Sequence, residues 1–343
     1  MRVKDYDYEL PLDLIAREPR EHNGERRSDS RLIVMDRQKN TVSHKKFKDI
    51  EFYMDAGDVL VLNNSKTIKA NLVGTYNTQR KIEIDLCGMC DNGVWLCFVQ
   101  FDNNINVGGR VAFSKNEMKL TGVVVEKIAN NVWAIKFDQS NVIDIANEIG
   151  RPIISHYFKE RFDIELLQNT YSTVYGSSEL PAAGRHFDKE LLEKISNKGV
   201  SIVFVTLHTG LSSINVNTEN FEDFQMHNEN IEITEDVADT INKAKKNHKK
   251  IIATGTTVVR TLESCVDDNG FVKPYKGPTN LYIYEGFKFK VVDKFITNFH
   301  APRSTRIAMA AAFSGKELLS RCYREAIDKK YLFYEFGDAT LTI

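Results

Sequence analysis

The sequence has almost no excess of charge of either sign, with 46 Lys and Arg against 47 Asp and Glu in 343 residues. Any contact with nucleic acid therefore has to come from a local patch, because the chain as a whole is not basic. Long hydrophobic runs are also missing, and the longest small-apolar stretch, 307–313, is too short to cross a membrane. These absences exclude a polybasic chain and predict a soluble protein.

Cysteine is scarce, with five residues, and the first residues, MRVKDYDYELP, do not resemble a secretory signal. Both features are typical of a reducing compartment, so we expect the protein in the cytoplasm. Cys87, Cys90 and Cys97 suggest a metal site, but no histidine lies between His44 and His156 to complete a local ligand set. Because the surrounding pattern is that of strands, we expect ordinary buried thiols and no metal ion.

The apolar pattern divides the chain into two kinds of region. Between 81 and 138, strand-like segments follow one another without a helical period. The turn-forming groups that separate them are Asp91-Asn92-Gly93, Asn103-Asn104, Gly108-Gly109 and Asn130-Asn131. Five or six such strands are expected to close into a small antiparallel barrel. The flanking regions mix helix and strand patterns. We therefore predict a discontinuous α/β catalytic domain, residues 1–65 and 139–343, with an inserted β-barrel domain, residues 66–138.

Helices and strands alternate beyond the barrel. Helical spacing is expected over 142–149, before Gly150, and again after Asp188 and after Thr234, which both suit the N-cap position. Buried-strand patterns follow at 201–207 and 251–253. This order of elements is that of an α/β layer.

The stretch KIIATGTTVVRTLES, residues 250–264, changes from a strand pattern to a helical one at a Gly-Thr-Thr turn. Thr256 and Thr257 are good N-cap residues, and the new helix points its unpaired N–H groups toward the carboxyl edge of the sheet. Anionic ligand groups settle at such positions. The predicted binding residues are Gly255, Thr256, Thr257 and Arg260. The alternative is a plain strand-to-helix connection with Arg260 exposed to solvent.

Four histidines stand at junctions of the expected elements: His186 in PAAGRHF, His208 in FVTLHTG, His227 in QMHNEN and His300 in ITNFHAP. Each alone is more often structural than catalytic, but four beside glycines at strand ends favour a shared pocket. The motifs G-x-S-x-G, H-E-x-x-H and the Walker loop are absent from the sequence. The residues by themselves predict an α/β enzyme with a histidine-lined pocket.

Seven segments, in chain order, resemble the S-adenosylmethionine:tRNA ribosyltransferase-isomerases of queuosine biosynthesis. They are MRVKDYDYELPLDLIAREP, SRLIVMD, GDVLVLNNS, FVTLHTG, GTTVVRTLES, VVDKFITNFHAPRST and the terminal FGDA. The resemblance implies that the ribosyl moiety of S-adenosylmethionine is transferred to 7-aminomethyl-7-deazaguanine at the tRNA wobble position and isomerised. The products would be epoxyqueuosine-tRNA, adenine and methionine. The resemblance also implies S-adenosylmethionine as co-substrate without a metal, and we expect a monomer that binds tRNA through a local patch.

This chemistry needs proton transfers that imidazoles suit, because a C5′ proton must leave, adenine must be protonated and the incoming amine must lose its charge. The catalytic candidates are His186, His208 and His300, with individual roles open. Contacts to substrate or co-substrate are expected from the turn residues named above and from Asn63, Asn64, Arg185, Gly210, His227, Asn298 and Arg306. The two adjacent asparagines are equally well explained as plain turn residues.

The chain departs from the family pattern around this expected pocket. Arg185 and Arg306 stand where leucine is usual, and the segments 63–66, 154–157 and 211–214 also differ. Two added positive charges favour an anionic group in the substrate, whereas neutral drift would leave them solvated or paired with a carboxylate. Three functions stay open: tRNA modification, the same ribosyl chemistry on another, anionic acceptor, and a non-catalytic RNA-binding homologue. The last would be expected to lose the histidines first.

Overall fold

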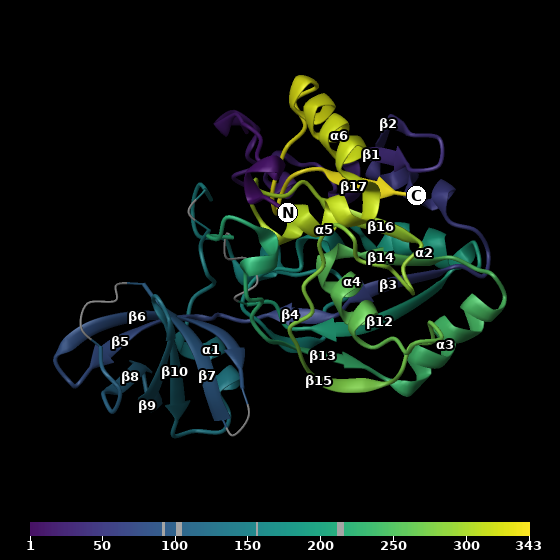
Figure 1. Ribbon diagram of the computed structural model, residues 1–343. Coiled ribbons are helices and arrows are strands. Elements are labelled where there is room, and N and C mark those ends of the chain that lie inside the picture. The colour runs from purple at the N-terminus through teal and green to yellow at the C-terminus, as the bar shows by residue number, and fades with distance from the viewer. Residues whose placement is uncertain (91–92, 101–104, 156, 211–215) are drawn as a thin grey trace.

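The computed structural model describes residues 1–90, 93–100, 105–155, 157–210 and 216–343. Figure 1 shows a large α/β body, which contains both termini, and a smaller β-barrel beside it. A nine-stranded mixed sheet and a closed six-stranded antiparallel barrel confirm the predicted fold class. Within the described residues, no helix is long and apolar enough to cross a membrane.

The nine-stranded sheet has the order β15-β13-β12-β3-β14-β16-β17-β1-β2. Its strands are β1 (Arg31–Asp36), β2 (Thr41–Lys46), β3 (Val59–Asn63), β12 (Ser201–Leu207), β13 (Glu229–Ile233), β14 (Ile251–Thr254), β15 (Tyr275–Thr279), β16 (Lys294–Asn298) and β17 (Ala339–Thr342). The central strands β12, β3, β14 and β16 run parallel, and β3 and β14 are apolar and buried along almost their whole length. Their carboxyl ends therefore bring Asn63, Thr254 and Asn298 to one edge of the sheet.

Helices cover both faces of this sheet (Figure 1). They are α2 (Lys189–Asn197), α3 (Glu235–Lys246), α4 (Gly255–Ser264), α5 (Thr305–Ser314) and α6 (Lys316–Asp328). One apolar cluster joins α3, α4, α5 and α6 to the sheet, and a second joins α2 to residues of the opposite face. The described residues also contain short 3-10 turns: Val3–Tyr6, Leu12–Leu14, Arg20–Asn23, Arg27–Asp29, Phe47–Tyr53, Ile164–Leu167, Ala182–His186 and Phe221–Asp223.

Side chains cap the starts of α2 and α5, whereas α4 begins without a side-chain cap. The Asp188 carboxylate accepts a hydrogen bond from the Leu191 N–H at 2.9 Å, so α2 begins where the sequence predicts. Helix α4 begins earlier than predicted, because Thr254 and not Thr256 or Thr257 occupies the N-cap position. Gly255 then has a φ of 87°, a left-handed conformation that only glycine adopts without strain.

The barrel has six strands in the order β10-β7-β6-β5-β8-β9, as predicted. They are β5 (Asn71–Tyr76), β6 (Arg80–Met89), β7 (Val94–Val99), β8 (Arg110–Lys115), β9 (Met118–Ala129) and β10 (Val132–Phe137). Gly108 and Asn131 have φ of 86° and 61°, values that tight turns require. The turn residues expected at 91–92 and 103–104 lie outside the described residues.

Helix α1 (Val142–Ile149) differs from the predicted domain division. Its buried residues Val142, Ile145 and Ala146 belong to the apolar cluster of the barrel, although the predicted boundary at 138 placed them in the α/β domain. The amphipathic pattern predicted the helix but not which body its apolar face would meet. A two-stranded sheet of β4 (Ser65–Thr67) and β11 (Val174–Ser177) lies between the bodies. That residues 66–138 fold as a separate domain stays a prediction.

The cysteines are all free, but not all are buried as expected: Cys90 is exposed and Cys87 half-buried, while Cys97 is buried in the barrel. Among the residues that the structure describes, no group of three His, Cys, Asp or Glu side chains is arranged to hold a metal ion.

Candidate active site

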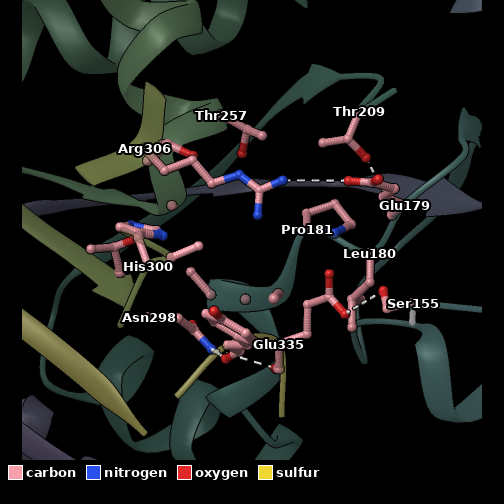
Figure 2. A pocket seen from close by; sticks show the side chains of 18 of the residues that line it. Ser155, Glu179, Leu180, Pro181, Thr209, Thr257, Asn298, His300, Arg306 and Glu335 are labelled. Carbon is pink, nitrogen blue, oxygen red and sulfur yellow. Dashed lines mark hydrogen bonds and ion pairs between the residues drawn. The ribbon is translucent and has the colours of Figure 1, made fainter. Parts of the chain in front are cut away.

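A cavity of about 560 Å³ lies at the carboxyl edge of the central strands, and Figure 2 shows it from close by. The ends of β3, β14 and β16, the first turn of α4 and the segment 179–184 line it, and Asp85 and Gln100 approach from the barrel. This is the edge at which open α/β sheets bind ligands, and the volume suits a nucleoside-sized molecule.

The structure brings half of the predicted site residues to this cavity: Asn63, Gly255, Thr256, Thr257, Asn298, His300 and Arg306 line it. The other half lie elsewhere: Asn64, Arg185, His186, His208, Gly210, His227 and Arg260 are not among its lining residues. The altered segment 211–214 and His156 lie outside the described residues.

His300 is the predicted catalytic histidine that lines the cavity. Its Nε2 lies 2.9 Å from Thr297 Oγ1, and its backbone N–H donates to the Tyr323 hydroxyl at 3.0 Å. Burial, with a smaller contribution from the Arg306 guanidinium, lowers the pKa of His300 to about 3. The imidazole is therefore neutral at pH 7 in this state.

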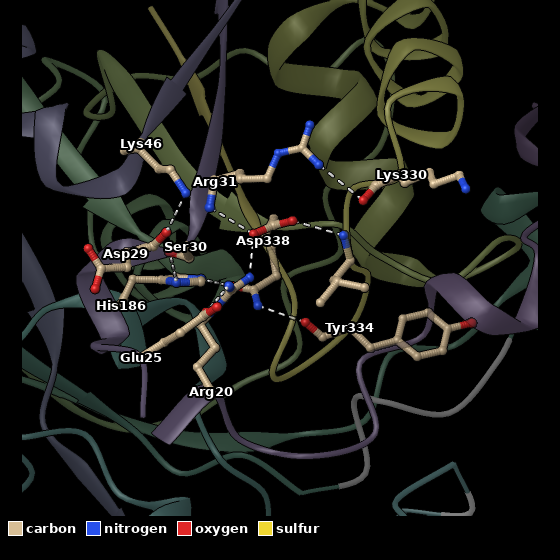
Figure 3. Close-up of polar contacts among 12 residues, drawn as sticks. Arg20, Glu25, Asp29, Ser30, Arg31, Lys46, His186, Lys330, Tyr334 and Asp338 are labelled. Atoms are coloured by element: carbon tan, nitrogen blue, oxygen red, sulfur yellow. Dashed lines mark hydrogen bonds and ion pairs between the residues drawn. The ribbon is translucent and has the colours of Figure 1, made fainter. Parts of the chain in front are cut away.

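His186 is not among the residues that line the cavity, so its catalytic role stays a prediction. Its Nδ1 lies 2.8 Å from Ser30 Oγ (Figure 3). Its Nε2 lies 3.1 Å from Asn298 Oδ1, and the ring stacks on Phe47. Since an amide oxygen only accepts, Nε2 carries the proton and Nδ1 accepts from the serine hydroxyl. Burial lowers the pKa of His186 to about 3, which agrees with this neutral form. The ring contacts Asn298, which lines the cavity.

His208 likewise holds structure together. Its Nδ1 lies 2.7 Å from Ser65 Oγ, which lies 2.6 Å from Ser177 Oγ, so the imidazole joins β12 to the two-stranded sheet. Burial lowers its pKa to about 4. His227 is half-buried outside the cavity, and burial also lowers its pKa. His208 and His300 follow the ends of β12 and β16 as predicted, whereas His186 lies in a 3-10 turn before α2 and His227 precedes β13.

Arg260 is neither exposed to solvent nor directed at the cavity. It is buried in an ion pair with Glu229, and its Nε donates to the Leu281 carbonyl at 3.0 Å. The other oxygen of this glutamate accepts from the Gly210 N–H at 3.0 Å. Both predicted binding residues thus satisfy one buried carboxylate, because Arg260 lies on the inner face of α4 rather than in its first turn.

The two unusual arginines have different places. Arg185 is buried, its guanidinium donates to both Glu21 oxygens at 2.6 and 2.8 Å, and burial lowers its pKa to about 10. This matches the alternative in which the charge pairs with a carboxylate. Arg306 lines the cavity, with 33% of its side chain exposed and its Nη2 3.4 Å from Glu179 (Figure 2). Only Arg306 adds positive charge where a ligand could meet it.

The asparagines after β3 have structural contacts. Asn63 Nδ2 donates to the Leu207 carbonyl at 2.9 Å while its Oδ1 accepts from the Ser65 N–H at 3.0 Å. Asn64 Oδ1 accepts from the Thr206 hydroxyl at 2.7 Å. Asn63 still borders the cavity, whereas Asn64 fits the turn-residue interpretation.

Several polar cavity residues had no signal in the sequence: Asp85, Asn169, Tyr171, Glu179 and Glu335. Glu335 Oε2 accepts a hydrogen bond from Ser155 Oγ at 3.4 Å (Figure 2). Burial raises the pKa of the Asp85 carboxyl. Most of these residues lie in irregular segments, where no periodic pattern marks a side chain as inward-facing.

Three comparisons relate the chain to known proteins. The model of the family described as queuosine biosynthesis protein matches residues 3–342. The S-adenosylmethionine:tRNA ribosyltransferase-isomerases of Clostridium kluyveri and Acetivibrio thermocellus are 40% and 41% identical to it over 343 residues, each covering 99% of both chains. The solved S-adenosylmethionine tRNA ribosyltransferase of Thermotoga maritima is similar, with a TM-score of 0.57 and 32% identity, covering 99% of this chain and 100% of that chain.

Proposed function

This chain belongs to the queuosine biosynthesis protein family, and from that premise we propose that it is an S-adenosylmethionine:tRNA ribosyltransferase-isomerase. The observation that carries the proposal is the match at about 40% identity along the whole chain, barrel included. The reaction transfers and isomerises the ribosyl moiety of S-adenosylmethionine onto 7-aminomethyl-7-deazaguanine at the tRNA wobble position. Epoxyqueuosine-tRNA, adenine and methionine are the products.

We place the co-substrate in the 560 Å³ cavity, against the first turn of α4. The backbone N–H groups of Gly255, Thr256 and Thr257 belong to a helix start, where they have no intrahelical acceptor and attract anionic groups or hydroxyls. Arg306 supplies a full positive charge for a carboxylate, and Glu335 supplies a negative one for a cationic group. A molecule with an ammonium, a sulfonium and a carboxylate suits such a mixed surface.

Of the three predicted catalytic histidines, we propose that His300 alone meets the reacting molecules. Its neutral imidazole can accept a proton or a hydrogen bond, and Thr297 fixes its orientation. His186 is a positioning residue for Asn298, and His208 a positioning residue for the sheet that joins the two bodies. Asn63, Asn298 and Arg306 remain candidate binding residues because they line the cavity.

The partner tRNA needs a local basic surface, because the chain has no net positive charge. A second cavity of about 550 Å³ meets the first at Asn169, and its lining includes Arg27, Lys66 and Lys69. We propose that tRNA phosphates lie along these side chains while the wobble base enters the first cavity. A monomer and a cytoplasmic location belong to the same proposal.

One observation favours a second function, the same ribosyl chemistry on a different, anionic acceptor. Arg306 stands in the cavity at 3.4 Å from Glu179, near enough for a competing anion to replace this carboxylate. Arg185 gives no support, because Glu21 already neutralises it.

The test is to incubate the purified protein with S-adenosylmethionine and a tRNA that bears 7-aminomethyl-7-deazaguanine at the wobble position. Adenine release by chromatography should match the appearance of the modified nucleoside by mass spectrometry. The same tRNA with guanine at that position serves as the control and should give neither product. Adenine release that needs an acceptor other than tRNA would favour the second function instead.

A further inference from the structure

Three residues that line the cavity each have a buried side-chain atom without a hydrogen-bond partner among the described residues: Asn169 Oδ1, Tyr171 Oη and Thr254 Oγ1. The residues Asn169 and Thr254 are only 4% and 3% exposed. Buried polar atoms are nearly always paired in folded proteins, because an unmade hydrogen bond out of water is unfavourable. Three such unpaired atoms on residues that line one cavity indicate that a bound ligand forms the missing hydrogen bonds.

Two of these side chains converge on one glycine. A Cβ added to Gly184 would clash with Tyr171 Oη and lie 2.6 Å from Asn169 Nδ2, so both side chains pack against Gly184 where any other residue would have its Cβ. The neighbouring Ala183 comes within 3.4 Å of the Cβ that Gly255 lacks, which connects this wall to the residue after Thr254. The three atoms thus belong to one side of the cavity.

The hydrogen-bonding pattern of this wall can be read from its fixed contacts. Asn169 Nδ2 donates to the Pro181 carbonyl at 3.1 Å, and since a carbonyl only accepts, the amide orientation leaves Oδ1 as the acceptor. Burial raises the pKa of the Tyr171 phenol far above its usual value, so the hydroxyl keeps its proton. The wall therefore offers one obligate acceptor beside two hydroxyl donors.

We propose that Asn169, Tyr171 and Thr254 bind the adenine ring of S-adenosylmethionine, and this rests on the function proposed above. Asn169 Oδ1 accepts from the exocyclic amine, and the two hydroxyls donate to ring nitrogens. Thr254 and Gly255 belong to the strand-to-helix turn assigned to the co-substrate, which is why adenine and not the deazaguanine base is expected here. Hydroxyls that donate to ring nitrogens also stabilise adenine as it departs with the electron pair of the glycosidic bond.

The experiment measures calorimetric affinities of two unreactive probes, S-adenosylhomocysteine and S-inosylhomocysteine, for the full-length protein. Inosine replaces the exocyclic amine by a carbonyl oxygen, which Asn169 Oδ1 cannot contact favourably, so the unaltered protein should prefer the adenosyl probe. Tyr171→Phe and Thr254→Val should each lower the affinity for the adenosyl probe roughly 3- to 10-fold, as expected for the loss of one neutral hydrogen bond. Asn169→Leu should abolish most of the preference between the two probes.

The matched controls are Ser172→Ala and Tyr282→Phe, because Ser172 Oγ and Tyr282 Oη are also unpaired among the described residues but do not line this cavity. Both controls should bind the adenosyl probe as the unaltered protein does. Removal of an unpaired buried hydroxyl should leave the ligand-free melting temperature unchanged or higher. A loss of affinity in Tyr171→Phe without a loss of stability is then a binding effect, and this variant suffices if Asn169→Leu does not fold.

Unchanged adenosyl-probe affinity in both Tyr171→Phe and Thr254→Val, with normal adenine release by the unaltered protein, would overturn this inference and leave the proposed function standing. A raised KM for tRNA with unchanged probe affinity would also overturn it and assign the wall to the deazaguanine base. If the unaltered protein binds no adenosyl probe and releases no adenine, the proposed function itself fails.

Discussion

At the scale of the residue, the same side-chain chemistry has different consequences depending on what each group contacts. The neutral histidines are one example, since burial lowers the pKa of His186 and His300 to about 3 and of His208 to about 4. The ordinary value in the unfolded chain is about 6.5. At a pH between these values, the three imidazoles are protonated in the unfolded chain but neutral in the folded chain.

The contribution of these neutral histidines to the free energy of unfolding should therefore be fully present above about pH 6.5. It should decrease as the pH falls toward 4. His208→Gln should make this fall shallower by about one proton, or about 1.4 kcal/mol per pH unit, in urea unfolding measured from pH 7 to pH 4.5. His248→Asn, away from these contacts, is the control and should follow the unaltered slope. If the free energy of unfolding of His208→Gln falls as steeply with decreasing pH as that of the unaltered protein, the fold does not keep this imidazole neutral.

The two arginines should separate binding from stability. If the acceptor is anionic, Arg306→Leu should raise the KM for the acceptor by roughly 10- to 100-fold, because a charge-assisted hydrogen bond to a ligand contributes about 1.5–3 kcal/mol. Its melting temperature should hardly change, since a partly exposed ion pair contributes little. Steady-state kinetics and thermal unfolding measure the two effects.

Arg185→Leu is the matched comparison. It leaves the partly buried Glu21 with less compensation and should lower the free energy of unfolding by about 1–3 kcal/mol, with KM unchanged. Equal KM values for Arg306→Leu and the unaltered protein would mean that the guanidinium in the cavity touches no substrate.

At the scale of the element, the turn from β14 into α4 depends on backbone conformation. Gly255→Ala should lower the free energy of unfolding by about 1–2 kcal/mol, because the φ of 87° is left-handed and strains any residue with a Cβ. The affinity for S-adenosylhomocysteine should fall with it. Gly88→Ala is the control, since nothing lies within 4 Å of the Cβ it would add. Chemical denaturation and calorimetry would check both, and an unaltered affinity in Gly255→Ala would remove the turn from the co-substrate site.

Most elements follow from local pattern, whereas the inward-facing side chains do not. Helix α2 begins at its capping aspartate, and β12 and β14 occupy the apolar runs that predict them. Arg260 pairs with the buried Glu229 and not with solvent or the cavity, which the sequence does not predict. The helical period does not say which face of α4 a neighbouring strand covers. Asn169 and Tyr171 lie in an irregular segment, so their burial depends wholly on distant contacts.

At the scale of the whole molecule, the two bodies share a boundary that α1 can locate. A fragment of residues 66–153 should unfold at a higher temperature than a fragment of residues 66–138, because Val142, Ile145 and Ala146 complete the apolar cluster of the barrel. Circular dichroism during heating measures the difference. Equal melting temperatures for the two fragments would mean that α1 does not stabilise the barrel and belongs to the α/β body.

The sequence by itself determined the alternation of helices and strands, the inserted barrel, the family and the strand ends at which polar residues gather. These follow from period, turn chemistry and local order, which act between residues close in the chain. Only the tertiary structure decided that His300 and Arg306 line the cavity while His186, Arg185 and Arg260 bind partners elsewhere. The physical reason is that a side chain at a junction can turn either way, and its direction depends on which distant carboxylate, amide or hydroxyl can pair with it once water is excluded.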